Sequence, residues 1–357
     1  MSSLLMATRT RSGSPRCSRL PPSPPSCSLQ RERSASTLRL WRTSREHSSE
    51  SAYLAWPPPG DVPRPDPRLR RGPIELVLVD NRAHQLPEAP GHRAGYNGIA
   101  VLLHEQQPRT LFVPEYAGLN FEHIHDGTSE GLAEPFEPRV FSMELRRVDE
   151  HTYELYQPPT GNFQLESCGR YRLLPEGVIE YTLECVPREE TFRRGFMGLF
   201  WASYIHQPED LSIWFLGHEA DGEQRPDWIN GMTPRHGVDA THPPAEAGFL
   251  PRIDADFRLT LVNHPSRYVH TSGWYFGVCR GMAWLQVFRR RDRIWLAQSP
   301  SGGGQGNPAW DFQWFVPDCR PGEAYGFVMR AAYVPFENRE QIARLAARLQ
   351  AELEQAE

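Results

Sequence analysis

The stretch YNGIAVLLHEQQPRTLFVPEYAGLNFEHIHD, residues Tyr96–Asp126, decides the fold. Its apolar runs at 98–105 and 110–114 are separated by turn residues, which is typical of short β-strands. The stretch then leads directly into polar side chains that are able to do chemistry, Glu122 and His123 among them. A strand pattern followed by reactive side chains predicts a β-rich body with a polar site near a strand end.

Similar runs continue outward from this stretch, and turn residues separate them. No alternation of strands with helices appears, which disfavours a parallel sheet. We therefore expect an all-β fold, a large antiparallel β-sandwich of the supersandwich type, with a meander over 140–186. The expected strands lie at 74–80, 98–105, 110–114, 140–148, 151–157, 162–174, 177–186, 211–217, 257–263, 282–290, 293–299, 311–317 and 324–334.

Three regions divide the chain. Residues 1–72 are rich in Ser, Arg and Pro and lack periodicity, which predicts a disordered leader. Residues 73–336 form the expected sandwich domain. Residues 337–357 show apolar side chains at helical spacing behind an N-cap, Asn338 followed by Gln341, which predicts an amphipathic helix packed on the sandwich across a sheet edge. The leader has no continuous apolar region of a secretory signal, so we expect a cytoplasmic protein.

Composition excludes several classes of function. The sequence contains no lysine, so Schiff-base chemistry, the phosphate-binding loop and kinase-type ATP sites are excluded. Residues 1–72 hold 13 Arg against 5 acidic residues, leaving 26 against 39 in the remainder, an excess of 13 negative charges. Such a surface repels phosphate backbones, so we expect no nucleic-acid partner. No run approaches the ~18 apolar residues of a membrane span. The oligomeric state stays open.

The cysteines show no metal or redox spacing. Cys17 and Cys27 lie in the leader, and the other four are scattered without a CxxC pair. We expect free thiols, with a bond between Cys168 and Cys185 on neighbouring strands as the alternative.

A first cluster could bind a metal. His123 and His125 point to the same face if they lie on a strand, and Glu130 follows five residues later. Two imidazoles and a carboxylate suit a divalent transition metal. The motif resembles the first metal motif of the cupin barrels, and that resemblance implies iron, manganese or zinc bound by these three residues. The alternative is a pair of strand-end histidines with no cofactor.

Other candidate residues lie in or beside long intervals expected to be loops, 187–210, 218–255 and 299–310. A tryptophan in such a loop can stack on a sugar ring, and histidines can transfer protons. Arginine can hold a carboxylate or a uronic acid. The candidates from these segments and their flanks are His206, Trp228, His236, His242, Arg280, Trp310 and Asp311.

Residues 74–334 resemble the galactose mutarotase-like β-supersandwich in strand density, in domain size and in the phrase EYAGLNFEHIHDG. The resemblance implies that fold and a carbohydrate-directed activity. The family's histidine phrase, roughly HxYFNL, has its closest echo in HTSGWYFG at 270–277, which departs from it at several positions. No catalytic residue is therefore carried over.

Three hypotheses about function follow. The first is a carbohydrate-active protein of epimerase, lyase or hydrolase type that acts on or binds a small or oligomeric sugar or uronide in a concave groove. The second is the cupin-like metal enzyme, and the third is a non-catalytic carbohydrate-binding or structural sandwich. In the first, the catalytic residues come from His123, His125, His206, His236 and His242. The substrate-binding residues are Glu122, Trp228, Arg280, Trp310 and Asp311.

Overall fold

The computed structural model describes residues 67–134, 136–257, 259 and 264–355, all within the compact unit Leu40–Glu357. The predicted disordered leader lies outside the described residues, apart from its last six positions. Within those, Arg68–Arg71 forms a strand that pairs with its neighbour. The strand expected at 257–263 also falls mainly outside the described residues.

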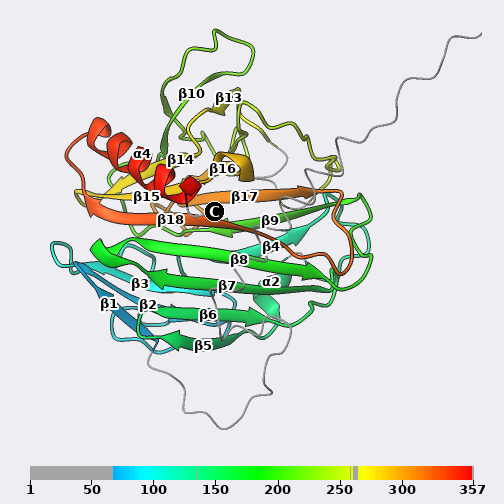
Figure 1. Cartoon of the computed structure of the whole chain (residues 1–357), viewed down its shortest axis with the longest axis horizontal. Helices are drawn as coiled ribbons and strands as arrows, with labels where there is room; N and C mark the ends of the chain where they lie inside the picture. Colours follow the sequence, from blue (N-terminus) through cyan, green and yellow to red (C-terminus); the bar gives the residue numbers. More distant parts are fainter. Residues whose placement is uncertain (1–66, 135, 258, 260–263, 356–357) are drawn as a thin grey trace, which may run out of the picture. The chain divides into compact units, whose positions relative to one another are not determined.

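The described chain forms antiparallel sheets, as predicted (Figure 1). A three-stranded sheet has the order β1-β2-β3, and a five-stranded sheet has the order β12-β16-β17-β9-β4. The bounds of their strands are β1 Arg68–Arg71, β2 Ile74–Val79, β3 Gly98–His104, β4 Asn120–His125, β9 Phe196–Ala202, β12 Thr241–His242, β16 Trp295–Ser299 and β17 Ala309–Pro317.

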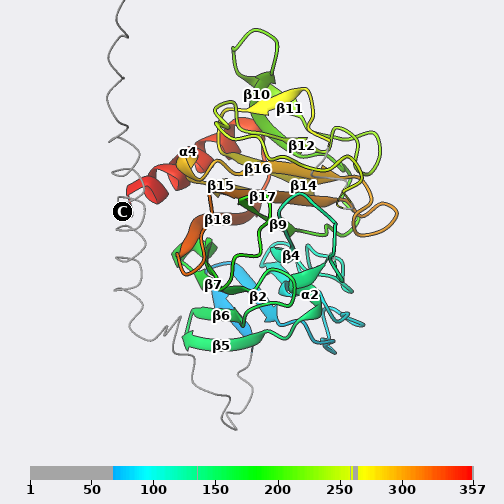
Figure 2. The same ribbon diagram turned by 90° about the vertical axis from the view of Figure 1, so that its right-hand side faces the viewer.

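The largest sheet has the order β11-β10-β14-β15-β18-β8-β7-β6-β5, with β13 also paired to β10. Its strands β5 to β8 are the predicted meander. Figure 2 shows β10 and β11 at one end of this body and β5 and β6 at the other. The bounds are β5 Glu144–Asp149, β6 Thr152–Gln157, β7 Leu165–Leu173, β8 Ile179–Pro187, β10 Trp214–Glu219, β11 Asp227–Asn230, β13 Tyr268–His270, β14 Trp274–Cys279, β15 Met282–Phe288 and β18 Tyr325–Pro335.

The main hydrophobic core lies between the sheets and takes alternate side chains from each strand. On β9, Leu199 and Trp201 belong to this core, whereas Phe200 and Ala202 belong to a separate cluster. Phe312 on β17 stacks on Trp201 with ring centroids 5.1 Å apart. Because successive strand residues face opposite sides, the five-stranded sheet has a second, outer face that is free to carry other chemistry.

The predicted C-terminal helix is α4, Arg339–Gln355, and short helices are α2 (Glu137–Val140), η1 (Pro175–Gly177) and η2 (Arg290–Asp292). Asn338 Oδ1 accepts a hydrogen bond from the Gln341 backbone N–H at 2.9 Å, which confirms the expected cap. The helix buries its apolar stripe against β14, β15 and β18. The helix thus lies on a face of the largest sheet and not, as we expected, across a sheet edge. The apolar side chains on that face account for this position. No helix among the described residues is both long and apolar enough to cross a membrane.

Some local predictions were wrong. The interval 187–210 contains β9, a run buried on both faces that lacks the polar alternation of a half-exposed strand. The segment 110–114 is extended but makes only an isolated bridge, Phe112 to Ile205. The four described cysteines are free. Cys168 is paired in register with Glu184 and therefore faces the side opposite to Cys185.

Candidate functional site

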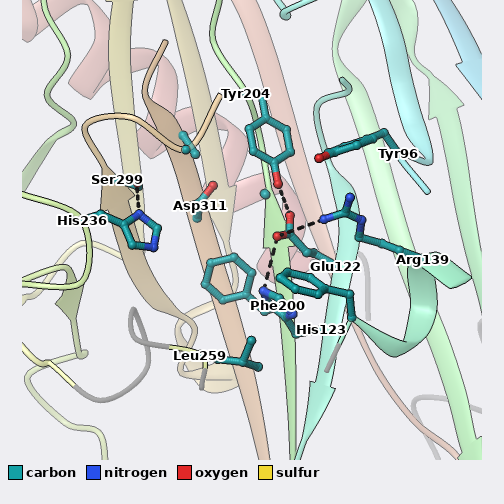
Figure 3. Close-up of a pocket in the computed structure, with 14 residues that line it drawn as sticks. Tyr96, Glu122, His123, Arg139, Phe200, Tyr204, His236, Leu259, Ser299 and Asp311 are labelled. Atoms are coloured by element: carbon teal, nitrogen blue, oxygen red, sulfur yellow. Dashed lines mark hydrogen bonds and ion pairs between the residues drawn. The ribbon is translucent and has the colours of Figure 1, made fainter. Parts of the chain in front are cut away.

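A pocket of about 270 Å³ opens on the outer face of the five-stranded sheet. This volume approaches the lower end of typical ligand pockets, about 300 Å³, and suits a molecule the size of one sugar. Its walls combine aromatic rings with carboxyl, imidazole and guanidinium groups (Figure 3). The lining residues are Tyr96, Glu122, His123, Phe136, Arg139, Phe200, Ala202, Tyr204, His236, Leu259, Ser299, Gly302, Ala309 and Asp311.

A β-bulge places two neighbouring reactive side chains in this pocket. On β4, Phe121 pairs with Trp201 and His123 pairs with Phe200, so the register shifts by one residue at Glu122. Strict alternation would send Glu122 and His123 to opposite faces of the sheet. The bulge turns both toward the pocket, which is a common use of bulges beside functional sites.

Glu122 is the most connected group of the pocket. Its Oε2 accepts hydrogen bonds from the Tyr204 hydroxyl and, at 3.1 Å, from Asn120 Nδ2. Its Oε1 lies 3.3 Å from His123 Nε2 and 3.6 Å from Arg139 Nη1. Burial alone would raise the pKa of Glu122, but these neighbours outweigh burial and lower it. Glu122 is therefore an ionised carboxylate.

Arg139 is held in the wall of the pocket by its own contacts. Its Nε donates to the Gly95 carbonyl at 2.8 Å, and its guanidinium lies 4.0 Å from the centre of the Tyr96 ring. This is the distance of a cation–π contact. The side chain is thereby fixed beside Glu122, with which it forms an ion pair.

Asp311 on β17 is in the opposite electrostatic state. It is 1% exposed, and burial, with a smaller effect of the Glu122 charge, raises its pKa well above the usual value. Its Oδ1 accepts the Ser203 backbone N–H at 3.1 Å. Its Oδ2 has no hydrogen-bond partner within the described chain. Burial thus favours the neutral form of Asp311, and its Oδ2 is a buried oxygen without a partner among the described residues.

The wall across from Glu122 carries a histidine. His236 Nδ1 lies 2.8 Å from the hydroxyl of Ser299, on β16. Figure 3 shows Asp311 between this pair and Glu122. The pocket thus contains two carboxyl groups with pKa values shifted in opposite directions, together with two imidazoles, and groups of this kind can accept and donate protons.

Four of the residues predicted from the sequence line this pocket: Glu122, His123, His236 and Asp311. The other predicted histidines do not. His125 is buried among phenylalanines, with the Phe257 ring 5.2 Å away. Burial lowers the pKa of His242 to about 3, and its Nδ1 lies 2.7 Å from the Ser266 hydroxyl. His206 lies beside Arg280, and burial and that charge lower its pKa.

The remaining predicted binding residues have structural contacts outside the pocket. Trp228 packs edge-on against Trp274 in the apolar cluster below α4. Trp310 is fully buried in the main core, and its Nε1 donates to the Leu211 carbonyl at 3.0 Å. Arg280 donates to the backbone carbonyls of His206 and Thr110 at 2.5 and 2.6 Å. These three side chains therefore contribute to packing and hydrogen bonding within the fold.

The structure does not bring His123, His125 and Glu130 together as a metal site. His123 lines the main pocket, whereas Glu130 lines a different one together with Asp126 and Arg193. Among the described residues, no group of three or more His, Cys, Asp or Glu side chains is arranged to hold a metal ion.

Several pocket residues were not identified from the sequence, notably Tyr96, Arg139, Tyr204 and Ser299. One signal for part of this wall is present in the run FMGLFWASY. Every second residue of this run points outward, and these residues alternate between small and aromatic side chains: Gly198, Phe200, Ala202 and Tyr204. Small residues beside rings on one sheet face leave a hollow lined by aromatic side chains.

Comparisons with known proteins give structural neighbours at low sequence identity. No family model matches the chain, and a search of curated proteins found no match. Similar solved structures include the Slr1438 protein from Synechocystis sp. PCC 6803, at 10% identity and a TM-score of 0.44 over 78% of this chain and 100% of that one. Galactose 1-epimerase from Lactobacillus acidophilus NCFM matches at 10% identity and a TM-score of 0.40, over 75% and 93% of the two chains.

Heparan sulfate lyase from Pedobacter heparinus is also similar, at 8% identity and a TM-score of 0.39. The match covers 85% of this chain and 42% of the lyase. A galactose 1-epimerase is thus among the structures to which this chain is similar, in line with the galactose mutarotase-like resemblance expected from the sequence. Similarities at these TM-scores carry no argument about activity or substrate.

Proposed function

We propose that the pocket binds a monosaccharide-sized sugar and interconverts its anomers by proton transfer, as a sugar 1-epimerase. The observation that carries the proposal is the pair of buried carboxyl groups, Glu122 and Asp311, whose pKa values are shifted in opposite directions within one pocket. Such a pair supplies a base and an acid at the same pH. The protein would then be a carbohydrate-active enzyme that needs no cofactor for this step.

The chemistry follows from the two protonation states. Ionised Glu122 takes the proton of the anomeric hydroxyl as the ring C–O bond breaks, and neutral Asp311 gives its proton to the ring oxygen. The open-chain aldehyde rotates, and the reverse transfers close the ring on the other face. Tyr96, Phe200 and Tyr204 provide aromatic surface for the C–H faces of the sugar.

Electrostatics favour this reaction over cleavage of a uronide by a lyase. A lyase also uses a base and an acid, but a cation must neutralise the uronate carboxylate before the neighbouring proton can leave. Arg139, the guanidinium that lines the pocket, is already paired with Glu122. A neutral sugar therefore suits the pocket better than an acidic one.

The test is mutarotation of freshly dissolved α-anomers of glucose, galactose and related aldoses, followed by polarimetry or NMR with the full chain. Wild type should exceed the buffer rate, and Asp311→Asn and Glu122→Gln should each lower the enzymatic rate by about 10²- to 10⁴-fold. His206→Asn, outside the pocket, should keep the wild-type rate. The proposal fails if no aldose is accelerated, or if both carboxyl variants are as active as wild type.

A further inference from the structure

Two buried polar side chains near the pocket lack hydrogen-bond partners among the described residues. Gln313 and His125 are both fully buried, at 0% exposure. Within the described part of the chain, neither the amide nitrogen nor the amide oxygen of Gln313 has a hydrogen-bond partner, and the same holds for both ring nitrogens of His125. Burial lowers the pKa of His125 to about 3, so its ring is neutral and presents one donor and one acceptor.

These two side chains lie on the same sheet face as the pocket. On β17, Gln313 follows Asp311 by two positions and therefore shares its face. Phe200 on β9 pairs with Gln313 on one side and with His123 on the other. One row further along, His125 pairs with Gly198, and a Cβ on Gly198 would overlap the imidazole of His125. The glycine thus leaves room for the His125 ring to lie across the sheet.

Leu259 connects the open pocket with the apolar cluster beside His125. It lines the pocket, and it also belongs to the apolar cluster formed by Phe196, Phe257, Trp295 and Phe315. In Figure 3 it lies on the side of Phe200 and His123, away from Tyr204. Two rings of that cluster, those of Phe257 and Phe315, lie 5.2 and 5.9 Å from the His125 ring.

Unpartnered polar groups in such a place need an explanation. A buried donor or acceptor without a partner loses its hydration, whereas an apolar side chain of the same shape does not. Stability alone would favour leucine or methionine at 313 and an apolar ring at 125. A ligand rich in hydroxyl groups supplies both donors and acceptors, which is what a neutral imidazole and a carboxamide require.

We propose that Gln313 and His125 form the floor of a second sugar subsite, which joins the first when the Leu259 side chain is displaced. The ligand is then a disaccharide or a longer oligosaccharide, with one residue in the open pocket and the next over the Gln313 and His125 pair. This inference rests on the proposed function, because it assumes a sugar in the first pocket.

The experiment compares sugars of one and two residues by titration calorimetry on the full chain. The probes are glucose and galactose against maltose, cellobiose and lactose. Leu259→Ala should tighten binding of at least one disaccharide by about tenfold or more relative to its effect on the monosaccharides. Adding Gln313→Leu to Leu259→Ala should remove that gain, and His125→Leu should act in the same way.

Thermal stability separates a ligand site from a structural polar network. Gln313→Leu should keep or raise the melting temperature, because it replaces an unpartnered group. The matched control is Gln286→Leu on β15, since Gln286 is equally buried but donates to the Tyr275 hydroxyl at 2.5 Å. This control should lower the melting temperature and leave disaccharide binding unchanged.

Three outcomes would overturn the second subsite. In the first, Leu259→Ala gains as much for monosaccharides as for disaccharides. In the second, Gln313→Leu leaves the gain in place. In the third, Gln313→Leu lowers the melting temperature as much as Gln286→Leu does. That result would mean that Gln313 hydrogen-bonds a buried water molecule in the folded protein and is not reserved for a ligand. If monosaccharides react while disaccharides bind no better, only the second subsite fails. If no sugar binds to either form, the proposed function fails with it.

Discussion

Replacing Asp311 by asparagine tests whether this buried carboxyl is neutral in the folded protein. Burial raises its pKa, so the folded state keeps the proton at pH values where an unfolded aspartate, with a pKa of about 3.9, has lost it. Wild type therefore loses about 1.4 kcal/mol of stability per pH unit between pH ~4 and the folded pKa. Asparagine cannot ionise, and its oxygen can still accept the Ser203 N–H. Asp311→Asn should gain on wild type by about 1.4 kcal/mol for each pH unit in that window.

The assay is urea unfolding of both proteins at about pH 5, 6 and 7, followed by tryptophan fluorescence. Asp210→Asn is the control of opposite sign. Burial would raise the pKa of Asp210, but hydrogen bonds from Ser212 and Trp214 outweigh burial and lower it. That carboxylate is ionised in both states above about pH 5, so its replacement should cost an amount that does not change with pH. A difference between Asp311→Asn and wild type that is constant over the three pH values would refute the neutral carboxyl.

Three further changes test contacts at the site and beneath the C-terminal helix. Glu122→Gln should lower the free energy of unfolding in urea by about 1–3 kcal/mol. Because the pKa of Glu122 is lowered in the folded protein, this loss of stability should shrink as pH falls below about 4. A loss of the same size at low pH would contradict this. Gly198→Ala should cost about 1–3 kcal/mol by overpacking against the His125 ring, so an unchanged melting temperature would count against that close contact. Arg339→Ala removes a guanidinium 5.4 Å from the Trp228 ring and should cost about 0.5–1 kcal/mol in thermal melts, with Arg339→Lys losing less.

The fold class was predictable because it depends on local patterns. Short apolar runs between turn residues identify antiparallel strands wherever one face is polar, as in the meander of β5 to β8. The same rule missed β9, Phe196–Ala202, although β15 is equally buried at all seven positions and was predicted. β9 differs in having a glycine, Gly198, inside the run, and an interior glycine weakens a strand pattern.

The candidate site was only partly predictable, since its members come from distant segments. Glu122 and His123 were found as one local cluster, and Asp311 was singled out at a strand start. Arg139 lies in the short helix α2 without any motif, and Tyr204 lies 82 positions from the carboxylate that it contacts. Strand pairing between remote segments decides such contacts, and no local pattern records which strands become neighbours.

Sheet geometry also bears on which reaction the two carboxyls can serve. Glu122 lies on β4 and Asp311 on β17, and β9 lies between those strands. Neighbouring strands are about 4.8 Å apart, so the two backbones are separated by roughly 10 Å. Ala202 on β9 is small and leaves the space between them open. A covalent glycosyl intermediate needs carboxyl groups about 5 Å apart, which would require both side chains to lean toward each other over β9. Side chains that stand upright from the sheet instead leave room for one sugar ring between a base and an acid, the arrangement that the proposed anomer interconversion needs.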